Sequence, residues 1–367
     1  MDNHNIDREK DYHEVDLVNY FQTFYLGFER AVKVVDSTDY FYNLGGATIR
    51  VRFAGSALIP QLTPALAHLK TEPVEQPDLT ICAWDSASTG VKLPLMATSL
   101  LELLRFYCWN RLDTRMEIKG YDNERFQSMF HLGSNLFNVL DVKENLALYW
   151  TDDADKMPYW ERSSPFRNLL DWWMSHRDLQ YVHAGAVGNK DGGILLVGKS
   201  GSGKSSTALA CLKSDLFYTG DDYCLVGTKP EPCVYSLYNT AKLKGQEDLE
   251  RFPHLEPFIS NRDRIFDEKA MIFINQHFPQ KIVDKLPIKA ILVPTVTGKP
   301  DTRVKKASAI VALKALAPST ILQLPKTGES ALERMTQLVK QVPCYILELG
   351  TDIPQIPQTI SKLLSEL

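Results

Sequence analysis

The first 150 residues carry two kinds of hydrophobic pattern, one with helical spacing and one with strict alternation. Apolar and aromatic side chains recur at intervals of three and four over residues 13–33, which predicts a helix. Apolar and charged residues alternate over residues 47–53, which predicts a strand with one exposed face. Residues 1–12 are polar and are expected to form a disordered lead-in. Shorter patterns predict a helix over 59–69 and strands over 79–84 and within 126–150.

A polar stretch rich in Asp, Ser and Pro separates this region from the next one. It covers residues 151–165 and contains no long apolar run. A chain of 367 residues is also longer than a single hydrophobic core usually supports. We therefore expect two domains: residues 1–155, an α+β domain of unknown role, and residues 165–367, which carry the chemical signals described below.

The second domain opens with two apolar runs joined by a tight turn. Residues 181–187 and 193–197 are predicted strands, and residues 188–192 between them supply Asn and Gly for a turn with positive φ. A turn this short joins antiparallel strands, because a parallel pair needs a crossover of about a dozen residues or more. The predicted fold is α/β with an antiparallel hairpin at its start. Its other predicted elements are helices over 166–174 and 354–364 and strands over 288–294 and 343–349.

The hairpin ends at a glycine-rich loop that carries the strongest chemical signal of the chain. Gly198–Ser205 fits G-x-x-x-x-G-K-[ST], the Walker A or P-loop pattern, and a helical pattern follows over 205–213. The glycines let successive N–H groups turn towards phosphate oxygens, Lys204 would lie along the phosphates, and the Ser205 hydroxyl would bind Mg²⁺. The loop therefore predicts binding of ATP, or of GTP as the open alternative, with Mg²⁺. The expected nucleotide-binding residues are Gly198, Ser200, Gly201, Ser202, Gly203, Lys204, Ser205 and Ser206.

Two adjacent carboxylates follow one helix later. Asp221 and Asp222 lie within the apolar run 216–226, which is predicted to be a strand. In phosphoryl transfer, one carboxylate can hold Mg²⁺ and the other can accept the proton of an attacking hydroxyl. Neighbouring residues of a strand point to opposite sides, so a turn near Gly220 is needed to bring both to one centre. Two carboxylates held close together repel, which raises the pKa of one of them.

The charge and composition of the chain exclude several classes of protein. Lys and Arg number 41 against 45 Asp and Glu, a formal net charge of −4, so no basic surplus indicates a nucleic-acid partner. The six cysteines are scattered without a C-x-x-C pair, which argues against a zinc or disulfide framework and favours a reducing compartment. The N-terminus lacks a signal-peptide core, and no apolar stretch is long enough to span a membrane. A cytoplasmic protein without a membrane partner is expected, and homo-oligomerisation is left open.

Three segments together resemble the catalytic domain of the HPr serine kinase/phosphorylase family. They are His183-Ala184-Gly185 before the hairpin, the loop Gly198–Ser205, and Gly220-Asp221-Asp222. The resemblance implies that family's P-loop kinase fold, which it shares with ATP-dependent phosphoenolpyruvate carboxykinase. It also implies a catalytic role for His183, Lys204, Asp221 and Asp222 and metal binding by Ser205 and Asp222, with His183 facing the transferred phosphate and the two Asp sharing base and metal duty.

The chain departs from that family in one segment. The family's Glu-[Ile/Val]-Arg-Gly-Leu-Gly sequence is absent, and its nearest equivalent is Ser236–Gly245, where Lys242 or Lys244 would stand near the phosphates. The chain is therefore similar to divergent HPr-kinase-like proteins, some of which phosphorylate serine on a peptide or a small metabolite. HPr itself is not indicated as the acceptor.

The expected function is that of an ATP-dependent kinase that transfers the γ-phosphoryl group to a serine-type hydroxyl of a protein, peptide or small molecule. One alternative is a regulatory protein that responds to a nucleotide without transferring phosphate. Another is a carboxykinase-like enzyme, although no arginine cluster suited to a dicarboxylate lies near the loop in the sequence. The identity of the acceptor and the role of the first domain are left open.

Overall fold

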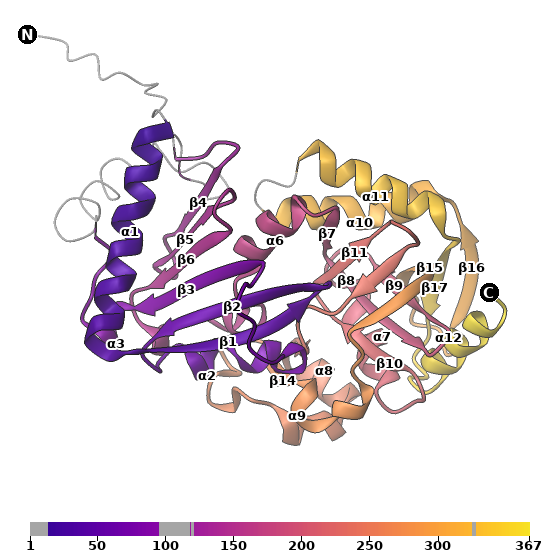
Figure 1. Cartoon of the computed structure of the whole chain (residues 1–367). Helices are drawn as coiled ribbons and strands as arrows, with labels where there is room; N and C mark the ends of the chain where they lie inside the picture. The colour runs from indigo at the N-terminus through magenta and orange to yellow at the C-terminus, as the bar shows by residue number, and fades with distance from the viewer. Residues whose placement is uncertain (1–13, 95–117, 119–120, 325–327) are drawn as a thin grey trace, which may run out of the picture. The chain divides into compact units, whose positions relative to one another are not determined.

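The computed structural model describes residues 14–94, 118, 121–324 and 328–367 (Figure 1). The predicted lead-in, residues 1–12, lies outside the described residues. The described chain folds into two compact units. Unit 1 comprises the described residues within Met1–Phe41, Thr48–Gln61 and Glu72–Pro158, and unit 2 those within Tyr42–Ala47, Leu62–Thr71 and Tyr159–Leu367.

Unit 1 is built on a mixed sheet with the strand order β1-β2-β3-β6-β5-β4. The pair β2–β3 and the pair β3–β6 are parallel, while β4, β5 and β6 pair in antiparallel fashion. The strands are β1 Ser37–Leu44, β2 Ala47–Ala54, β3 Leu79–Asp85, β4 Phe126–His131, β5 Leu136–Asp141 and β6 Leu146–Thr151.

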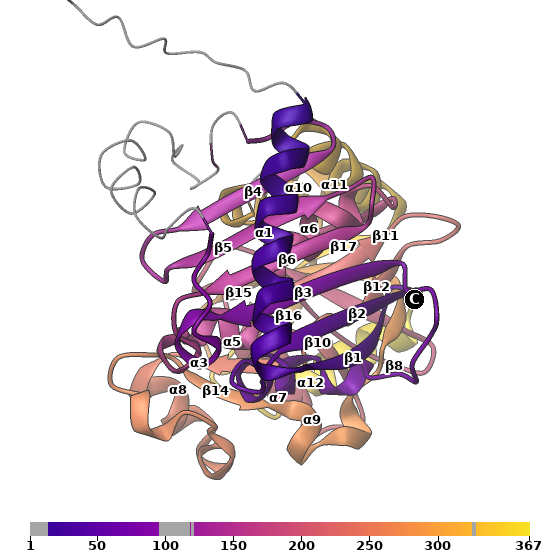
Figure 2. The same cartoon turned by 60° about the vertical axis from the view of Figure 1, so that its left-hand side comes forward.

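One long helix, α1 Glu14–Val35, lies across a face of this sheet (Figures 1 and 2). Its buried Phe24 and Phe28 pack in one apolar core with Trp84 and Trp150 of the sheet. This contact explains the helical spacing of apolar residues along α1, because one stripe of the helix must face the sheet. The remaining short elements of this unit are α2 Ile59–Leu62, α3 Ser86–Thr89 and the 3-10 helix η2 Ala154–Lys156.

The single helix predicted over 59–69 is wrong. The chain forms α2 and then a separate 3-10 helix, η1 Pro64–Leu69, which belongs to unit 2. Pro64 has no N–H to donate to the preceding turn, so the hydrogen bonding of the first helix is interrupted there although Thr63 keeps helical φ and ψ.

Unit 2 contains a larger mixed sheet whose strands join through the long strand β15 Lys285–Val296. Residues Lys285–Pro287 of β15 pair antiparallel with β12, whereas its later residues pair parallel with β9 and β17. The short half of the sheet is β12-β11-β7, and the long half contains β10-β8-β9 and β17-β16. The strands are β7 Leu179–Val182, β8 Ala184–Asn189, β9 Gly192–Val197, β10 Phe217–Gly220, β11 Cys224–Gly227, β12 Cys233–Tyr235, β16 Arg303–Ala307 and β17 Cys344–Leu349, with a separate ribbon of β13 Thr240–Leu243 and β14 Ala270–Phe273.

Helices cover both faces of the long half. On β9, Ile194 and Leu196 pack into the core under α7 Lys204–Cys211 and α12 Gln355–Ser365. Leu195 and Val197 point the other way, into the core under α10 Ala309–Gln323 and α11 Glu329–Gln341. This burial on both faces explains why the strand reads as a continuous apolar run. The other helices of unit 2 are α5 Tyr159–Ser163, α6 Arg167–Ser175, α8 Gly245–Arg251, α9 Ile274–His277 and the 3-10 helices η3 Pro253–Phe258, η4 Arg262–Arg264 and η5 Pro279–Lys281.

Two strands that the sequence predicts as continuous are broken in the structure. The run 181–187 divides at His183 into β7 and β8, and the run 216–226 divides at Asp221–Tyr223 into β10 and β11. Strand β7 pairs with β11 in the short half, whereas β8 pairs with β9 and β10 in the long half. At both breaks the chain therefore passes between the two halves of the sheet, a change of pairing partner that leaves the local apolar pattern unaltered.

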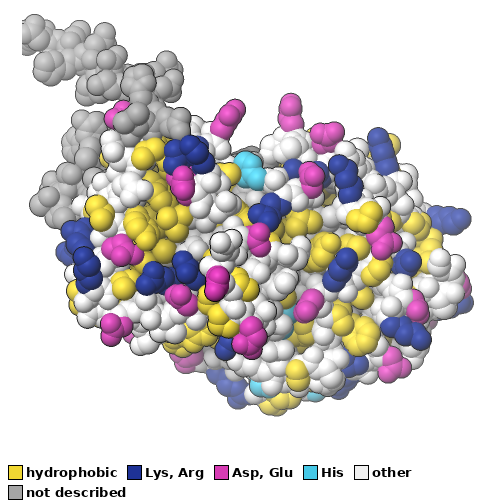
Figure 3. Space-filling model, in the orientation of Figure 1, with side chains coloured by type: hydrophobic (Ala, Val, Ile, Leu, Met, Phe, Trp, Pro, Cys, Tyr) yellow, Lys and Arg dark blue, Asp and Glu magenta, His cyan; other side chains and the backbone are white. Residues whose placement is uncertain are grey.

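The surface carries mixed charge on the face seen in Figure 3, where Lys and Arg side chains are interspersed with Asp and Glu. Such mixing produces no large field of one sign there. Over the residues that the structure describes, none of the helices combines the length and the apolar character that crossing a bilayer requires.

The packing of α12 leads to a stability prediction. Ile360 is fully buried in the core of unit 2, and Lys362 on the same helix is exposed. Replacing Ile360 by Ala should lower the free energy of unfolding by about 2–5 kcal/mol, because it removes buried methylene groups and leaves a cavity. Urea titration followed by circular dichroism measures this loss. The matched control Lys362→Ala should change the free energy of unfolding by less than about 0.5 kcal/mol. Equal losses in the two variants would contradict the assigned packing.

Candidate active site

The glycine-rich loop connects the buried strand β9 to the start of α7. It closes on itself through the backbone, since the N–H of Ser202 donates to the carbonyl of Lys199 at 3.2 Å. Gly203 has φ +104°, and a Cβ at this position would overlap the Leu349 side chain. A side chain at this position would be strained by the backbone conformation and would displace Leu349, which favours glycine.

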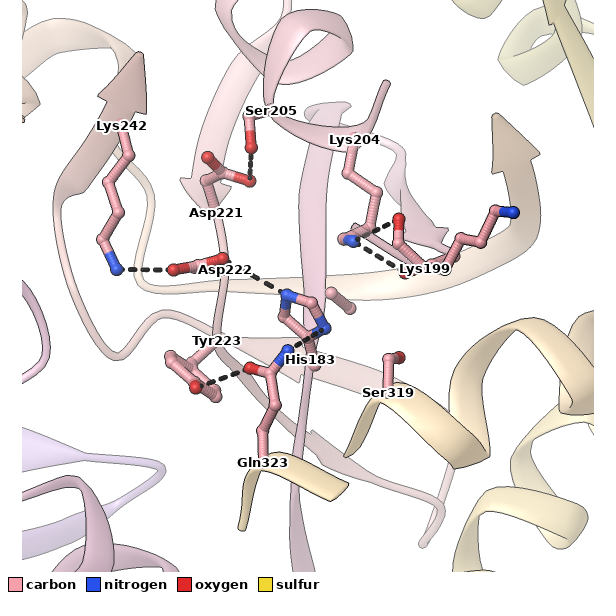
Figure 4. A network of polar contacts seen from close by, with 12 residues as sticks. His183, Lys199, Lys204, Ser205, Asp221, Asp222, Tyr223, Lys242, Ser319 and Gln323 are labelled. Atoms are coloured by element: carbon pink, nitrogen blue, oxygen red, sulfur yellow. Dashed lines mark hydrogen bonds and ion pairs between the residues drawn. The ribbon is translucent and has the colours of Figure 1, made fainter. Parts of the chain in front are cut away.

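Lys204 is buried beneath this loop with an exposed fraction of 5%. Its Nζ donates to the carbonyl of Gly198 at 2.7 Å and more weakly to that of Lys199 at 3.4 Å. Burial lowers the pKa of Lys204, and the charges of Asp221 and Asp222 oppose that shift. Figure 4 shows the exposed Lys199 side chain directed away from the rest of the cluster. The ammonium of Lys204 thus lies within the loop, where an anion would be its stronger partner.

Asp221 is the member of the carboxylate pair that contacts the loop. Its Oδ1 accepts a hydrogen bond from Ser205 Oγ at 3.1 Å, while its Oδ2 is buried without a hydrogen-bond partner in the described part of the chain. Burial, and then repulsion by Asp222, raises the pKa of Asp221 to about 6. A buried carboxylate oxygen without a partner is costly, and a cation supplies the charge that it lacks.

Metal binding here would rest on few protein ligands. In the described ranges no three His, Cys, Asp or Glu side chains come together in a group that could hold a metal ion. Asp221 and Ser205 together offer two oxygen ligands. Mg²⁺ is commonly held by one or two such ligands, with waters and substrate phosphates completing its octahedron, so this pair fits the ion.

A tight turn centred on Asp222 separates the two carboxylates. The N–H of Tyr223 donates to the carbonyl of Asp221 at 2.9 Å, and Asp222 has φ +70°. These are the features of a γ-turn with positive φ, which is rare and strained for a residue with a side chain. The turn sends the Asp221 carboxylate to the loop and the Asp222 carboxylate to a different set of partners (Figure 4).

Those partners are His183 and Lys242. Oδ1 of Asp222 lies 3.2 Å from His183 Nε2, and its Oδ2 lies 2.5 Å from Lys242 Nζ. Burial alone would raise the pKa of Asp222, but the charge of Lys242 and the contact with His183 hold it well below its usual range. Burial likewise opposes the charge on Lys242, and Asp222 raises the pKa of that ammonium. Asp222 is thus the more acidic member of the carboxylate pair.

His183 lies at the break between β7 and β8 with an exposed fraction of 4%. Its backbone N–H donates to Thr320 Oγ1 at 3.0 Å, and its ring nitrogen Nδ1 lies 3.2 Å from Gln323 Nε2. Burial lowers the pKa of His183, although the hydrogen bond to Asp222 opposes the shift. The imidazole is therefore neutral near pH 7 and is held between a carboxylate and an amide.

The structure brings together five side chains that the sequence singled out: His183, Lys204, Ser205, Asp221 and Asp222. Of the remaining loop residues, Ser202 has a buried Oγ without a hydrogen-bond partner among the described residues, Ser206 is half-buried at the start of α7, and Ser200 is exposed.

Of the two lysines in the 236–245 segment, Lys242 enters the site. Lys244 is exposed and caps α8 through its N–H, which donates to Asp248 at 2.7 Å. Sequence reasoning missed Gln323, Tyr223 and Arg167. Gln323 is separated from His183 by 140 positions, and nothing in its local sequence distinguishes it.

Comparisons with known proteins add little to this geometry. No family model matches the sequence, and a search of curated proteins finds no match either. Among solved structures, the HPr(Ser) kinase/phosphatase from Coxiella burnetii is similar over 51% of this chain and 97% of that chain, with 12% identity and a TM-score of 0.30. This is a distant structural match only, and at these values nothing about activity follows from it.

Unit 2 also contains a serine–histidine pair, formed by His68 and Ser236. His68 Nε2 is 2.7 Å from Ser236 Oγ, and its Nδ1 lies 3.3 Å from Asn239 Nδ2. The Asn239 amide is oriented by its bonds to Ala65 O and Asn275 N, so its NH₂ group donates to Nδ1. The His68 proton is therefore on Nε2 and faces the serine hydroxyl. An imidazole in this tautomer cannot take the proton of Ser236, so the pair is structural.

The partly buried position of His68 predicts a pH-dependent stability. Burial lowers the pKa of His68 from 6.5 to about 3, so the unfolded state binds the proton first as the pH falls. Stability is therefore full above about pH 6.5 and declines between about pH 6.5 and pH 3. Between about pH 7.5 and pH 5, His68 should contribute a loss of about 2 kcal/mol in the free energy of unfolding.

Urea titrations at these two pH values of the wild type and of His68→Gln would measure this contribution. The difference between the two pH values should shrink by that amount in His68→Gln. It should stay at the wild-type value in His176→Gln, which changes an exposed histidine. An unchanged difference in His68→Gln would contradict the burial of a neutral imidazole.

Proposed function

We propose that this protein is an ATP-dependent phosphotransferase that transfers the γ-phosphoryl group to a serine-type hydroxyl. The observation that carries the proposal is the division of the carboxylate pair. Asp221 contacts Ser205 of the glycine-rich loop, and Asp222 contacts His183 and Lys242. A phosphate loop next to two carboxylates in different environments is the arrangement that metal-assisted phosphoryl transfer needs.

The loop and Lys204 would hold the phosphates of the nucleotide. Lys204 donates to the carbonyls of Gly198 and Lys199, and phosphate oxygens would replace these neutral acceptors with charged ones. The N–H groups at the start of α7 face the same loop and favour an anion there. Binding would thus use groups that the fold already directs at one place.

Asp221 and Ser205 would be the protein ligands of Mg²⁺. When bound, the ion neutralises negative charge on the phosphates. The sequence interpretation placed the metal on Ser205 and Asp222. The contacts support the other carboxylate instead, because Ser205 bonds to Asp221 and both oxygens of Asp222 already have cationic or N–H partners.

Asp222 would be the group that orients the acceptor hydroxyl and accepts its proton. Each carboxylate oxygen has two lone pairs, so the bonds to His183 and Lys242 leave acceptor capacity on both oxygens. The low pKa of Asp222 does not exclude this role, because a loose phosphoryl transition state needs positioning of the nucleophile more than early proton removal.

The acceptor class is open between a protein, a peptide and a small molecule, and one experiment separates them. An extract of the native host would be incubated with γ-labelled ATP, Mg²⁺ and the purified protein. Label in a protein or peptide band identifies a protein or peptide kinase, and label in the soluble small-molecule fraction identifies a metabolite kinase. Nucleotide binding without transfer would favour a regulatory protein.

The lysines of the loop provide the matched variants for this assay. Lys204→Ala should reduce transfer by at least about a hundredfold, because it removes the charge that holds the phosphates in the transition state. Lys199→Ala removes an exposed lysine from the same loop and should leave transfer within about twofold of the wild type. Transfer retained in Lys204→Ala would contradict the assignment of the loop.

Replacing either carboxylate should impair phosphoryl transfer, but in a different way for each. Asp222→Asn should lower transfer by about a hundredfold or more while nucleotide affinity is kept, because the carboxylate that orients the acceptor hydroxyl and accepts its proton is lost. Asp221→Asn should instead raise the Mg²⁺ concentration needed for half-maximal transfer by at least about tenfold. Mg²⁺ titrations of transfer and of nucleotide binding distinguish these outcomes. The same Mg²⁺ requirement in both variants would refute the division of roles.

A further inference from the structure

We propose that Gln323, at the end of α10, is a positioning residue that fixes the tautomer of His183 and thereby directs an N–H group at Asp222. The statement about the tautomer rests on the structure of the free protein. Its consequence for transfer rests on the proposed function above. Figure 4 shows Gln323 between Tyr223 and His183, on the side of the imidazole opposite Asp222.

The direction of each hydrogen bond in this series follows from its first donor, which is Arg167. Arg167 Nη1 lies 3.0 Å from the hydroxyl of Tyr223, and a guanidinium can only donate. The hydroxyl accepts that bond and directs its own proton at Gln323 Oε1, 2.8 Å away. The Gln323 amide is thereby oriented with its oxygen towards Tyr223 and its NH₂ group towards His183.

The orientation of the Gln323 amide in turn fixes the tautomer of His183. The NH₂ group of Gln323 lies 3.2 Å from His183 Nδ1, so Nδ1 must be the unprotonated, accepting nitrogen. In a neutral imidazole the proton is then on Nε2, which lies 3.2 Å from Oδ1 of Asp222. The four bonds form one series in which every donor points towards the carboxylate.

Burial makes the reversed arrangement costly. The exposed fraction is 3% for Tyr223 and 4% for His183, so water cannot satisfy the ring nitrogens of His183 if they face the wrong partner; Gln323 itself is exposed. If the His183 proton moved to Nδ1, it would face the NH₂ group of Gln323, and Nε2 would face a carboxylate without a proton between them. Such a mismatch leaves the ring nitrogens of the buried imidazole without hydrogen-bond partners.

Helix α10 holds His183 at two points. Thr320 Oγ1 accepts from the His183 backbone N–H at 3.0 Å, and Gln323 contacts the ring. The two residues are three apart, which places them on one face of the helix. The helix therefore fixes both the main chain and the ring orientation of this residue.

The consequence is a defined role for His183. With its proton on Nε2 and its Nδ1 occupied, the imidazole cannot remove a proton from an acceptor hydroxyl. It acts as a donor that, together with Lys242, holds the Asp222 carboxylate in one orientation. Gln323 touches no reacting group and acts through His183.

The tautomer can be measured without any nucleotide. The protein would be labelled with ¹⁵N-histidine, and the His183 resonances would be assigned by their loss in His183→Gln. Long-range ¹H–¹⁵N spectra near neutral pH distinguish a protonated from an unprotonated ring nitrogen. We expect an unprotonated Nδ1 and a protonated Nε2 in the wild type. A protonated Nδ1 in the wild type would overturn the proposal, whatever the behaviour of the variants.

Variants of the series then test the role of the amide. Gln323→Leu should convert His183 to a mixture of tautomers. Tyr223→Phe should do so partly, because loss of the Tyr223 hydroxyl frees the Gln323 amide to rotate. The control Ser319→Ala lies on the same helix, where its hydroxyl bonds to the carbonyl of Leu316 at 3.0 Å, and should keep the wild-type tautomer. A folded Gln323→Leu that keeps the pure Nε2–H form would show that Gln323 does not set it.

Kinetics separate positioning from a merely structural role. Gln323→Leu should lower kcat for transfer by about tenfold with the KM for ATP unchanged, because Asp222 is less well oriented while the loop is intact. A rise in KM with unchanged kcat would contradict the positioning role. Absence of transfer in the wild type itself would refute the proposed function and leave the tautomer result as it stands.

Discussion

The site depends on one electrostatic constraint: two neighbouring carboxylates cannot be buried side by side with the same surroundings. A γ-turn at Asp222 resolves it by directing Asp221 towards the glycine-rich loop and Asp222 towards Lys242 and His183. Burial then raises the pKa of Asp221, while the two N–H-bearing partners hold the pKa of Asp222 down. Two chemically identical side chains thus acquire different properties, which is the condition for giving them different tasks.

The sheet of unit 2 provides the place where this division occurs. The chain crosses between the two halves of the sheet once at His183 and again at Asp221–Tyr223. Residues at such crossings lie between two strands and take no part in the hydrogen bonding of either one. Their polar groups can therefore bond with each other. The contact between His183 and Asp222 joins the two crossings directly. The strand β9, which pairs antiparallel with β8 and parallel with β15, brings the loop and Lys204 to the same region.

Local patterns in the sequence predict the strand and the helix that flank the glycine-rich loop. They do not predict the contacts between residues that lie far apart in the sequence. The strand and helix around Gly198–Ser205 follow from apolar periodicity. The sequence also predicts a turn near Gly220 that brings both carboxylates to one centre, but the turn is centred on Asp222 and directs the two carboxylates to different partners. The breaks at His183 and Asp222 could not be seen as ends of strands, because the apolar runs continue through them. Gln323 could not be found at all, since its role is set by a helix that returns to the site 140 positions later.

Asp222 also carries a backbone cost that its contacts must offset. A non-glycine residue with φ +70° at the centre of a γ-turn is destabilised by about 1–3 kcal/mol. Glycine would remove that cost but would leave Lys242 and His183 without the carboxylate that they share. The ion pair with Lys242 and the hydrogen bond from His183 hold the side chain on the far side of the turn from Asp221. Because these contacts come from the ribbon strand β13 and from the β7–β8 crossing, the strained turn is fixed by tertiary structure, and the position of the carboxylate depends on the whole of unit 2.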